Sequence, residues 1–171
     1  MRDDDIAKAA TRLLDICKRN NLTIATAESC TGGLLSAALT EIPGSSDVFD
    51  RGFVTYTNDA KRAMLNVPAD VLEQFGAVSR ETAEAMATGA LAHSPADLAV
   101  SITGIAGPGG GGQPDKPVGL VHFAAASRAG RLVHEAQRYG DIGRANVRRQ
   151  SVLQALDMLN RLARDSAPKT T

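Results

Sequence analysis

The sequence predicts a single α/β domain, a three-layer α/β/α sandwich built around a mixed sheet. A length of 171 residues suits one domain with one substantial core. Apolar runs typical of strands alternate with amphipathic helical segments over the first two thirds of the chain. Residues 118–126 and 131–139 then indicate two strands joined by a short turn. This pattern predicts a hairpin, and therefore a sheet that is not all parallel.

Local patterns justify each element. Residues 3–19 carry apolar side chains at helical spacing, with aspartates at the start and Lys18 and Arg19 at the end, as the helix dipole favours. Ser79 is a suitable N-cap for a helix that begins at residue 80. In chain order we expect helix 3–19, strand 22–27, helix 31–41, strand 48–56, short helices 58–64 and 68–75, helix 80–92, strand 97–103, strands 118–126 and 131–139, and helix 142–164. The expected domain is 1–165, followed by a disordered tail at 166–171.

Composition argues against several classes of protein. The 19 basic and 19 acidic residues give a formal net charge of zero and the chain has no Trp, so we expect no nucleic-acid partner. No apolar run is long enough to span a membrane, and the acidic residues 1–5 do not resemble the start of a signal peptide. Cys17 and Cys30 make no disulfide framework. We therefore expect a protein of the reducing cytoplasm, with no membrane contact.

The stretch 26–33, with the sequence Thr-Ala-Glu-Ser-Cys-Thr-Gly-Gly, is the first candidate site. It lies between an expected strand and an expected helix, where free backbone N–H groups attract an anion or a developing oxyanion. Paired glycines there allow close approach of a ligand. The candidates for catalysis or substrate contact are Ser29, Cys30, Thr31, Gly32 and Gly33. The alternative is a capped helix with Ser29 as its N-cap.

A glycine-rich loop occupies residues 104–117. Its segment 107–112 formally matches G-x-G-x-x-G, but the prolines that follow prevent a helix from starting there, which excludes a dinucleotide-binding fingerprint. Thr103 and Gly104 differ from the rest of the loop because they end a buried strand, and ligands of open α/β sheets collect at that edge. We therefore expect Thr103 and Gly104 in a site, and a flexible surface loop over 109–116.

Lys61 falls in the first turn of the expected helix 58–64. The positive end of a helix dipole disfavours an ammonium, so partial burial there would lower the lysine pKa and produce a base able to activate a serine. Ser46 and Tyr56 lie near it in the sequence. The alternative is an ordinary exposed lysine.

Arg144 and Arg148 share one face of the last expected helix. Two guanidinium groups on one face suit a phosphate or a carboxylate, although a solvated helix face has the same pattern. The histidines have no spacing typical of metal ligands or of a serine–histidine pair. We therefore expect no metal and no cofactor.

Together these motifs resemble the CinA C-terminal family, over nearly the whole chain from about residue 5 to residue 163. The motifs that carry the resemblance are the stretch 26–33, Pro-Gly-Ser-Ser at 43–46, Arg-Gly-Phe-Val-Thr-Tyr at 51–56 with Asn58 and Lys61, Gly-Ala-Val-Ser at 76–79, Ser-Ile-Thr-Gly-Ile-Ala-Gly-Pro at 101–108 and Lys-Pro-Val-Gly at 116–119. The family includes nicotinamide-nucleotide amidohydrolases, and the chain is similar to their stand-alone form, without the N-terminal domain of the larger CinA proteins. The resemblance implies hydrolysis of the carboxamide of nicotinamide mononucleotide to nicotinate mononucleotide and ammonia, in pyridine-nucleotide salvage.

The resemblance also implies roles for individual residues. It places the nucleophile at Ser46 and its base at Lys61 with Tyr56 nearby, assigns orientation or oxyanion stabilisation to Ser29 and Thr103, and assigns the substrate's phosphate to Arg144. The implied mechanism needs no metal and no cofactor. A sheet edge and apolar helices favour a homodimer.

Three alternatives remain open. Ser29 rather than Ser46 could carry the acyl group. Cys30 could act as a thiol nucleophile, since a helix N-terminus lowers a thiol pKa, although no histidine is placed to assist it. Finally, the chain could be a non-catalytic nucleotide-binding or regulatory module, because names in the family also record links to competence and DNA damage.

Overall fold

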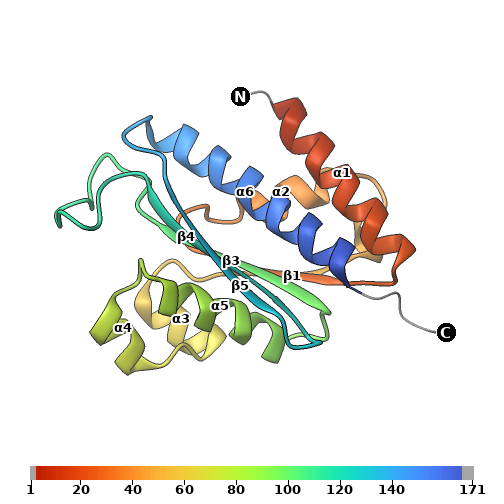
Figure 1. The fold of residues 1–171 in the computed structure, drawn as a ribbon, viewed down its shortest axis with the longest axis horizontal. Helices are drawn as coiled ribbons and strands as arrows, with labels where there is room; N and C mark the ends of the chain where they lie inside the picture. Colours follow the sequence, from red (N-terminus) through yellow and green to blue (C-terminus); the bar gives the residue numbers. More distant parts are fainter. Residues whose placement is uncertain (1–2, 167–171) are drawn as a thin grey trace.

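The computed structural model describes residues 3–166 and shows a five-stranded mixed sheet (Figure 1). The strands are β1 (Ile24–Glu28), β2 (Phe49–Val54), β3 (Leu98–Gly104), β4 (Leu120–Ser127) and β5 (Leu132–Arg138). Their order across the sheet is β2-β1-β3-β4-β5. Strands β2 and β3 run parallel to β1, whereas β4 is antiparallel to both β3 and β5. The expected mixed sheet and its terminal hairpin are therefore confirmed. Of the expected tail at 166–171, only Ser166 is described, and its hydroxyl donates to the carbonyl of Leu162 at 2.8 Å; the rest lies outside the described residues.

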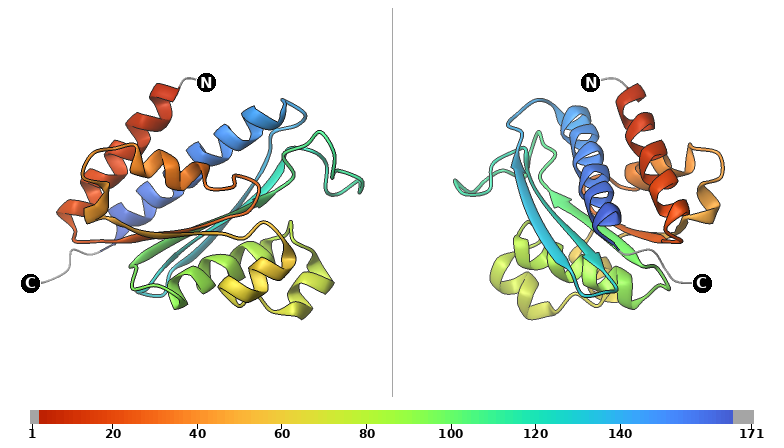
Figure 2. Two further views of the ribbon diagram at one scale, coloured as in Figure 1. Left: turned by 180° about the vertical axis from the view of Figure 1, so that it is seen from behind. Right: turned by 45° about the vertical axis from the view of Figure 1, so that its right-hand side comes forward.

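Helices cover both faces of the sheet and complete the three layers (Figures 1 and 2). One face carries α1 (Asp3–Arg19), α2 (Leu34–Thr40) and α6 (Arg144–Asp165), and the other carries α3 (Asn58–Leu65), α4 (Ala69–Phe75) and α5 (Arg80–Ala92). A 3₁₀ turn, η1 (Ser45–Asp47), precedes β2. The helices α3 and α5 begin after Thr57 and Ser79, whose side chains accept hydrogen bonds from backbone N–H groups of the first turn. The expected elements are all present, with ends shifted by a few residues.

The two faces of the sheet pack differently. Toward α1, α2 and α6 the core contains large side chains such as Phe123 and Leu156. Toward α3 and α5 it is rich in alanine, contributed by β1, β3 and β4 as well as by α5 itself. Small side chains let α5 approach its neighbours closely: a Cβ atom added at Gly89 would lie 2.1 Å from the carbonyl oxygen of Leu65 in α3. This close packing holds α3, and with it Lys61, against the sheet.

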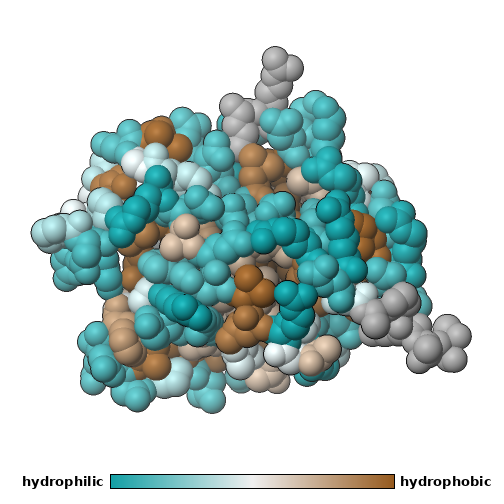
Figure 3. Space-filling model, viewed as in Figure 1, coloured by the Kyte–Doolittle hydropathy of each residue, from teal (hydrophilic) through white to brown (hydrophobic). Residues whose placement is uncertain are grey.

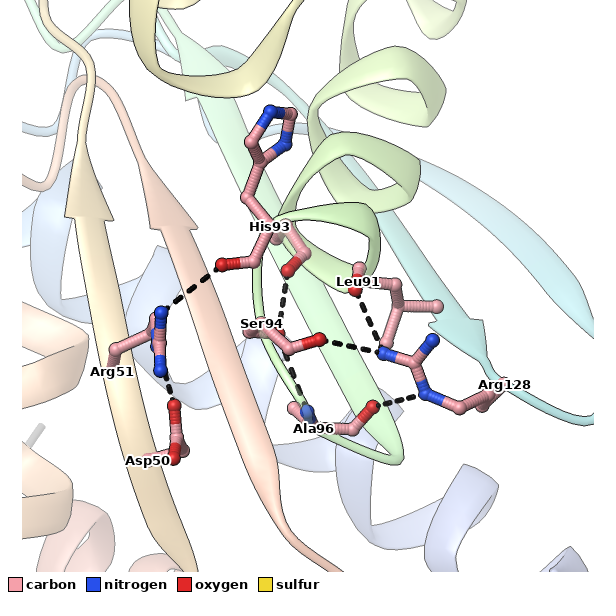
Figure 4. A network of polar contacts seen from close by, with 8 residues as sticks. Asp50, Arg51, Leu91, His93, Ser94, Ala96 and Arg128 are labelled. Atoms are coloured by element: carbon pink, nitrogen blue, oxygen red, sulfur yellow. Dashed lines mark hydrogen bonds and ion pairs between the residues drawn. The ribbon is translucent and has the colours of Figure 1, made fainter.

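The turn between β4 and β5 is fastened to the end of α5 by Arg128 (Figure 4). Its guanidinium donates hydrogen bonds of 2.7 to 2.9 Å to the carbonyl oxygens of Leu91, Ser94 and Ala96. A cation suits the C-terminal end of a helix, where carbonyl groups lack intrahelical donors. The network therefore fixes the end of the sheet where β1 and β3 begin.

The surface mixes polar residues with scattered apolar ones. On the face in Figure 3, hydrophobic residues form separate small groups among hydrophilic ones. Scattered exposure of this kind is ordinary for a folded protein and marks no particular partner. Within residues 3–166, no helix has the length and apolar character needed to cross a membrane.

Candidate active site

The carboxyl ends of the three parallel strands meet at one edge of the sheet. Glu28, the last residue of β1, pairs in register with Val54 of β2 and Ile102 of β3. The segments that follow these strands surround a cavity of about 240 Å³. Residues that the sequence indicated and that line this cavity are Ser29, Cys30, Tyr56, Lys61, Thr103, Gly104 and Arg144. A ligand site at this edge is what the parallel part of the sheet favours.

Lys61 and Ser29 form the central contact of the cavity. The Nζ atom of Lys61 lies 2.9 Å from Oγ of Ser29, and the lysine is 1% exposed. Ser29 directly follows β1 and is held there by its N–H, which donates to the carbonyl of Ile102 at 2.9 Å. Lys61 reaches the serine from the first turn of α3. Parallel pairing of β1 with β2 thus brings together two residues that are 32 positions apart.

Burial controls the ionisation of Lys61. Loss of hydration lowers the pKa of its ammonium from 10.5 to about 8, and a weaker interaction with the Cys30 thiol acts in the opposite direction. The direction is the one predicted from the sequence, but desolvation rather than the helix dipole is the main cause. Besides Ser29, the hydrogen-bond partners of Nζ among the described residues are the carbonyl oxygens of Thr55 at 2.9 Å and Tyr56 at 3.4 Å.

The three contacts satisfy an ammonium, which donates to all three oxygens, and they also suit the neutral amine. A neutral lysine has two N–H donors and one lone pair. Nζ donates to Ser29 Oγ in the protonated form. In the neutral form the carbonyls of Thr55 and Tyr56 take the two donors, and the lone pair accepts the hydroxyl proton of Ser29. A serine hydroxyl facing the lone pair of a buried amine is the arrangement that general-base activation of a nucleophile requires.

The N-terminus of α2 is not the anion site that the sequence predicted, because a side chain of the protein fills it. The fully buried carboxylate of Glu28 accepts hydrogen bonds from the N–H groups of Leu35 at 2.8 Å and Ser36 at 3.0 Å. The Ser36 hydroxyl donates to the same carboxylate at 2.8 Å. Glu28 therefore satisfies the first turn of α2 and fixes the end of β1 just before Ser29.

The helix α2 also begins later than expected, at Leu34. Gly32 and Gly33 precede it with positive φ angles of 56° and 103°, which glycine adopts without strain but an α-helix does not use. Gly33 occupies the N-cap position, so the alternative in which Ser29 caps this helix is wrong.

The turn after Ser29 contains peptide N–H groups that donate to no other described residue. The N–H of Gly32 donates to the carbonyl of Ser29 at 3.0 Å, whereas those of Cys30, Thr31 and Gly33 donate to no other described residue. Arg148 of α6 holds this turn from the other side, with Nε 3.2 Å from the carbonyl oxygen of Cys30 and Nη2 3.0 Å from that of Thr31. Because the N–H of a trans peptide points away from its carbonyl, these contacts direct the N–H of Thr31 away from Arg148.

The end of β3 forms another wall of the cavity. The Thr103 hydroxyl donates to the carbonyl of Ala77 at 2.7 Å and so ties β3 to the segment before α5. Gly104 has no room for a side chain, since a Cβ atom would lie 2.7 Å from the side chain of Val121 and 2.8 Å from the carbonyl of Leu120. Both residues line the cavity, as the sequence predicted.

Arg144 and Tyr56 lie together at the exposed side of the cavity. Nη2 of Arg144 donates to the Tyr56 hydroxyl at 2.7 Å, and Nη1 donates to the carbonyl of Gly107 at 2.8 Å. The tyrosine is 56% exposed. A guanidinium with access to both solvent and the cavity is well placed for an anionic group of a ligand.

Ser46 lies outside the cavity, contrary to the role that the resemblance implied for it. It is an exposed residue of η1, before the amino end of β2, whereas the cavity lies at the carboxyl ends of the strands. The serine in contact with Lys61 is Ser29. Thr31, Gly32 and Gly33 shape the turn but do not line the cavity, so direct contact between them and a ligand is not supported.

Burial makes the Cys30 thiol a poor nucleophile. Loss of hydration raises its pKa to about 11, although the nearby cations Arg148, Lys61 and Arg144 act in the opposite direction. A thiol with this pKa is protonated near neutral pH, and the thiolate is the reactive form. The thiol alternative is therefore disfavoured by the surroundings of Cys30.

Sequence reasoning missed the apolar wall of the cavity. This wall contains Ala77, Val78, Ile105 and Ala106. Apolar side chains carry no chemical signal, and these residues were indicated only through the motifs at 76–79 and 101–108. The supporting contacts of Glu28 and Arg148 were also missed, because neither follows from spacing along the chain.

Fold and site together define the class: a single-domain α/β protein with a buried serine–lysine pair at the carboxyl edge of its parallel strands. The chain matches the family model described as the CinA C-terminal domain over residues 6–163. The chain therefore belongs to the CinA C-terminal domain family.

Individual relatives agree with this membership. A Pseudomonas putida protein called nicotinamide-nucleotide amidohydrolase PncC is 48% identical over 159 residues, which cover 93% of this chain and 98% of that protein. A CinA-like protein of Parasynechococcus marenigrum is 47% identical over 160 residues, 93% of this chain and 37% of the relative. With three other curated relatives, too, the chain spans only 35% to 38% of their length. The crystal structure of the competence/damage inducible protein CihA from Agrobacterium tumefaciens matches with a TM-score of 0.91 and 57% identity, covering 92% of this chain and 95% of that one.

Proposed function

We propose that this protein hydrolyses the carboxamide of nicotinamide mononucleotide to nicotinate mononucleotide and ammonia, with Ser29 as nucleophile and Lys61 as base. The observation that carries the proposal is the 2.9 Å contact between these two side chains inside a cavity. The name of the Pseudomonas putida relative, of which the chain covers 98%, supports the substrate. Pyridine-nucleotide salvage in the cytoplasm is the role that corresponds to this activity.

In the first half of the proposed reaction, neutral Lys61 accepts the hydroxyl proton of Ser29 and Oγ attacks the carboxamide carbon. The N–H group of Cys30, which lines the cavity, is the available donor for the resulting oxyanion. Removing one such donor typically costs about a hundredfold or more in rate. The ammonium of Lys61 then returns its proton to the amide nitrogen, the C–N bond breaks, and ammonia leaves an acyl ester on Ser29.

In the second half, a water molecule replaces ammonia. Neutral Lys61 takes one proton from the water, and the oxygen attacks the acyl carbon of the ester. The bond to Oγ of Ser29 then breaks, and the serine regains its proton from Lys61. One water molecule is consumed for each ammonia released, and both residues return to their starting state.

Arg144 and Tyr56 provide a place for the substrate's phosphate. The guanidinium lies at the exposed side of the cavity, away from buried Lys61, so a bound nucleotide would place its amide inward and its phosphate outward. Charge-assisted hydrogen bonds between a guanidinium and a phosphate are strong and directional. Thr103 and Gly104 also line the cavity.

Ammonia release from nicotinamide mononucleotide by the purified protein tests this proposal. We expect Ser29→Ala to lose the activity. The matched control is Ser46→Ala, which alters an exposed serine outside the cavity and should retain turnover. Wild-type turnover in Ser29→Ala would contradict the assignment. Saturable binding of the nucleotide by the wild-type protein without any ammonia release would favour the non-catalytic binding module.

A further inference from the structure

The charged side chains that line the cavity are all basic. They are Lys61 and Arg144, and the lining contains no Asp or Glu, all of its residues being in the described part of the chain. Lys61 is buried beside Ser29, while Arg144 bonds to the exposed Tyr56. A positive charge on a bound ligand would therefore find no compensating carboxylate near Lys61.

Among residues 3–166, no acidic group contributes to the environment of the amine from the elements packed around it. The groups that face it are Cys30 from the turn after β1, Tyr56 from the segment before α3, and Arg144 from α6. Glu28 precedes Ser29, but its carboxylate is bonded to α2 on the opposite face of the sheet. On α3 itself, Asp59 and Arg62 are exposed.

The strand β4 lies one strand beyond β3, whereas α5 packs directly beside α3. His122 of β4 pairs in register with Thr103, and its Nδ1 atom lies 2.9 Å from Nε2 of His134. The acids of α5 that act on this histidine pair are Glu81 and Glu84. They do not contribute to the environment of Lys61. The ionisation of the lysine is thus open to the charge of whatever enters the cavity.

We propose, on the basis of the function proposed above, that the positive charge of the substrate's pyridinium ring is a working part of this site: when the ring binds, its charge expels the proton of Lys61 and so prepares the base. The site then selects carboxamides on cationic rings over the same amides on neutral rings. The expelled proton passes to solvent, and no bond of the substrate changes in this step.

The need for such a step follows from the free protein. With a pKa of about 8, Lys61 is mostly protonated near neutral pH, and a protonated amine cannot accept the proton of Ser29. A cation nearby disfavours the charged form and lowers the pKa of a lysine. A unit charge roughly 7 Å from Nζ shifts that pKa by about one to two units at an effective dielectric constant of about 20. A shift of this size makes the neutral amine the main form in the complex.

The same coupling acts on binding. Because linkage is reciprocal, the cationic ring binds more tightly to the neutral form of Lys61 than to the protonated form. The phosphate of the substrate acts in the opposite direction, but it lies near exposed Arg144, where pairing and solvent weaken its effect. A neutral-ring analogue with the same phosphate therefore isolates the contribution of the ring charge.

Proton release on binding tests the proposal directly. The protein is the Ser29→Ala variant, which cannot form the acyl ester, and the two ligands are nicotinamide mononucleotide and a C-linked benzamide ribonucleotide, in which a carbon replaces the ring nitrogen. Calorimetric titrations at about pH 7.5 in buffers of different ionisation enthalpy give the number of protons released. We expect roughly half a proton or more from Lys61 with the pyridinium ligand, and clearly less with the neutral one.

A second variant assigns the proton. In Ser29→Ala combined with Lys61→Met, the difference between the two ligands should disappear. Equal release with both ligands in the single variant would overturn the proposal, since it would trace the effect to excluded water rather than to charge. Equal absence of release would overturn it as well.

Kinetics of the wild-type protein give an independent readout. The pH profile of kcat/KM reports the free protein and that of kcat reports the complex. With nicotinamide mononucleotide we expect the kcat profile to titrate about one unit or more below that of kcat/KM. If the enzyme releases ammonia but the two profiles coincide, only the role of the ring charge is refuted. If it releases no ammonia, the proposed function itself is refuted.

Discussion

Replacement of Lys61 by Met should change how the stability of the protein depends on pH. In the folded protein the lysine pKa is about 8, compared with an ordinary value of 10.5. A lysine pKa that is lower in the folded state means that the unfolded chain binds more protons between these two values, so stability rises with pH across that window and is lowest below it. From about pH 7 to about pH 9, this linkage raises the free energy of unfolding of the wild-type protein by about 1 kcal/mol through Lys61 alone.

Urea unfolding followed by circular dichroism at the two pH values measures this effect. The free energy of unfolding of the wild type minus that of Lys61→Met should become more positive by about 1 kcal/mol from the lower to the higher pH. The buried thiols of Cys17 and Cys30 titrate at higher pH in both proteins, so their contribution cancels in the difference. The exposed Lys18→Met variant is the matched control and should follow the wild type. Parallel curves for the wild type and Lys61→Met would refute the claim that the amine is desolvated.

Substitutions of Arg144 and Arg148 in α6 should affect different kinetic parameters, KM for Arg144 and kcat for Arg148. Arg144→Ala should raise KM for nicotinamide mononucleotide by about 10- to 100-fold, since a hydrogen bond to a charged group contributes roughly 1.5–3 kcal/mol. Steady-state kinetics should show little change with nicotinamide riboside, which lacks the phosphate, and an unchanged KM for the nucleotide would argue against the phosphate contact. Arg148→Met should lower kcat by about tenfold or more with little change in KM, because the turn that presents the Cys30 N–H to the oxyanion loses two hydrogen bonds. Arg148→Lys should recover part of the rate; a lower melting temperature with unchanged kcat would make the role of Arg148 purely structural.

Local patterns in the sequence were sufficient to predict the layers of the fold. Strand β3 is a short run of apolar and small residues that ends at Thr103 and Gly104, and its placement in the buried middle of the sheet fits that composition. The cap of α5 was equally readable, since Ser79 is a typical N-cap residue in a suitable position. The start of α2 was misplaced because the positive φ angles of Gly32 and Gly33 are not visible in helical periodicity.

The family resemblance implied Ser46 as the partner of Lys61, but the serine in contact with Lys61 is Ser29. Ser46 precedes β2 and Ser29 follows β1, so in two adjacent parallel strands the two serines lie at opposite edges of the sheet. The rule that ligands collect at the carboxyl ends of parallel strands favours Ser29, once β1 and β2 are known to be neighbours. That pairing is a long-range property, and periodicity along the chain does not contain it.

The contacts that support the turn were unpredictable for a similar reason. Glu28 occupies a position in a fully buried strand, where an acidic residue has no local rationale. Its partners are N–H groups of the next helix, which become available only because the intervening turn folds back. Arg148 reaches the same turn from a helix 117 residues away in the sequence. Such contacts follow from the assembled fold.

Mass spectrometry of the trapped acyl intermediate tests the central claim most directly. Protein quenched during turnover of nicotinamide mononucleotide and digested with trypsin yields a single peptide, 20–51, that contains both Ser29 and Ser46 without an internal Lys or Arg, so its fragment ions must locate the adduct. We predict the nicotinate-nucleotide acyl group on Ser29. An adduct on Ser46 or on Cys30 would contradict the pairing of Ser29 with Lys61 as the chemical centre of this protein.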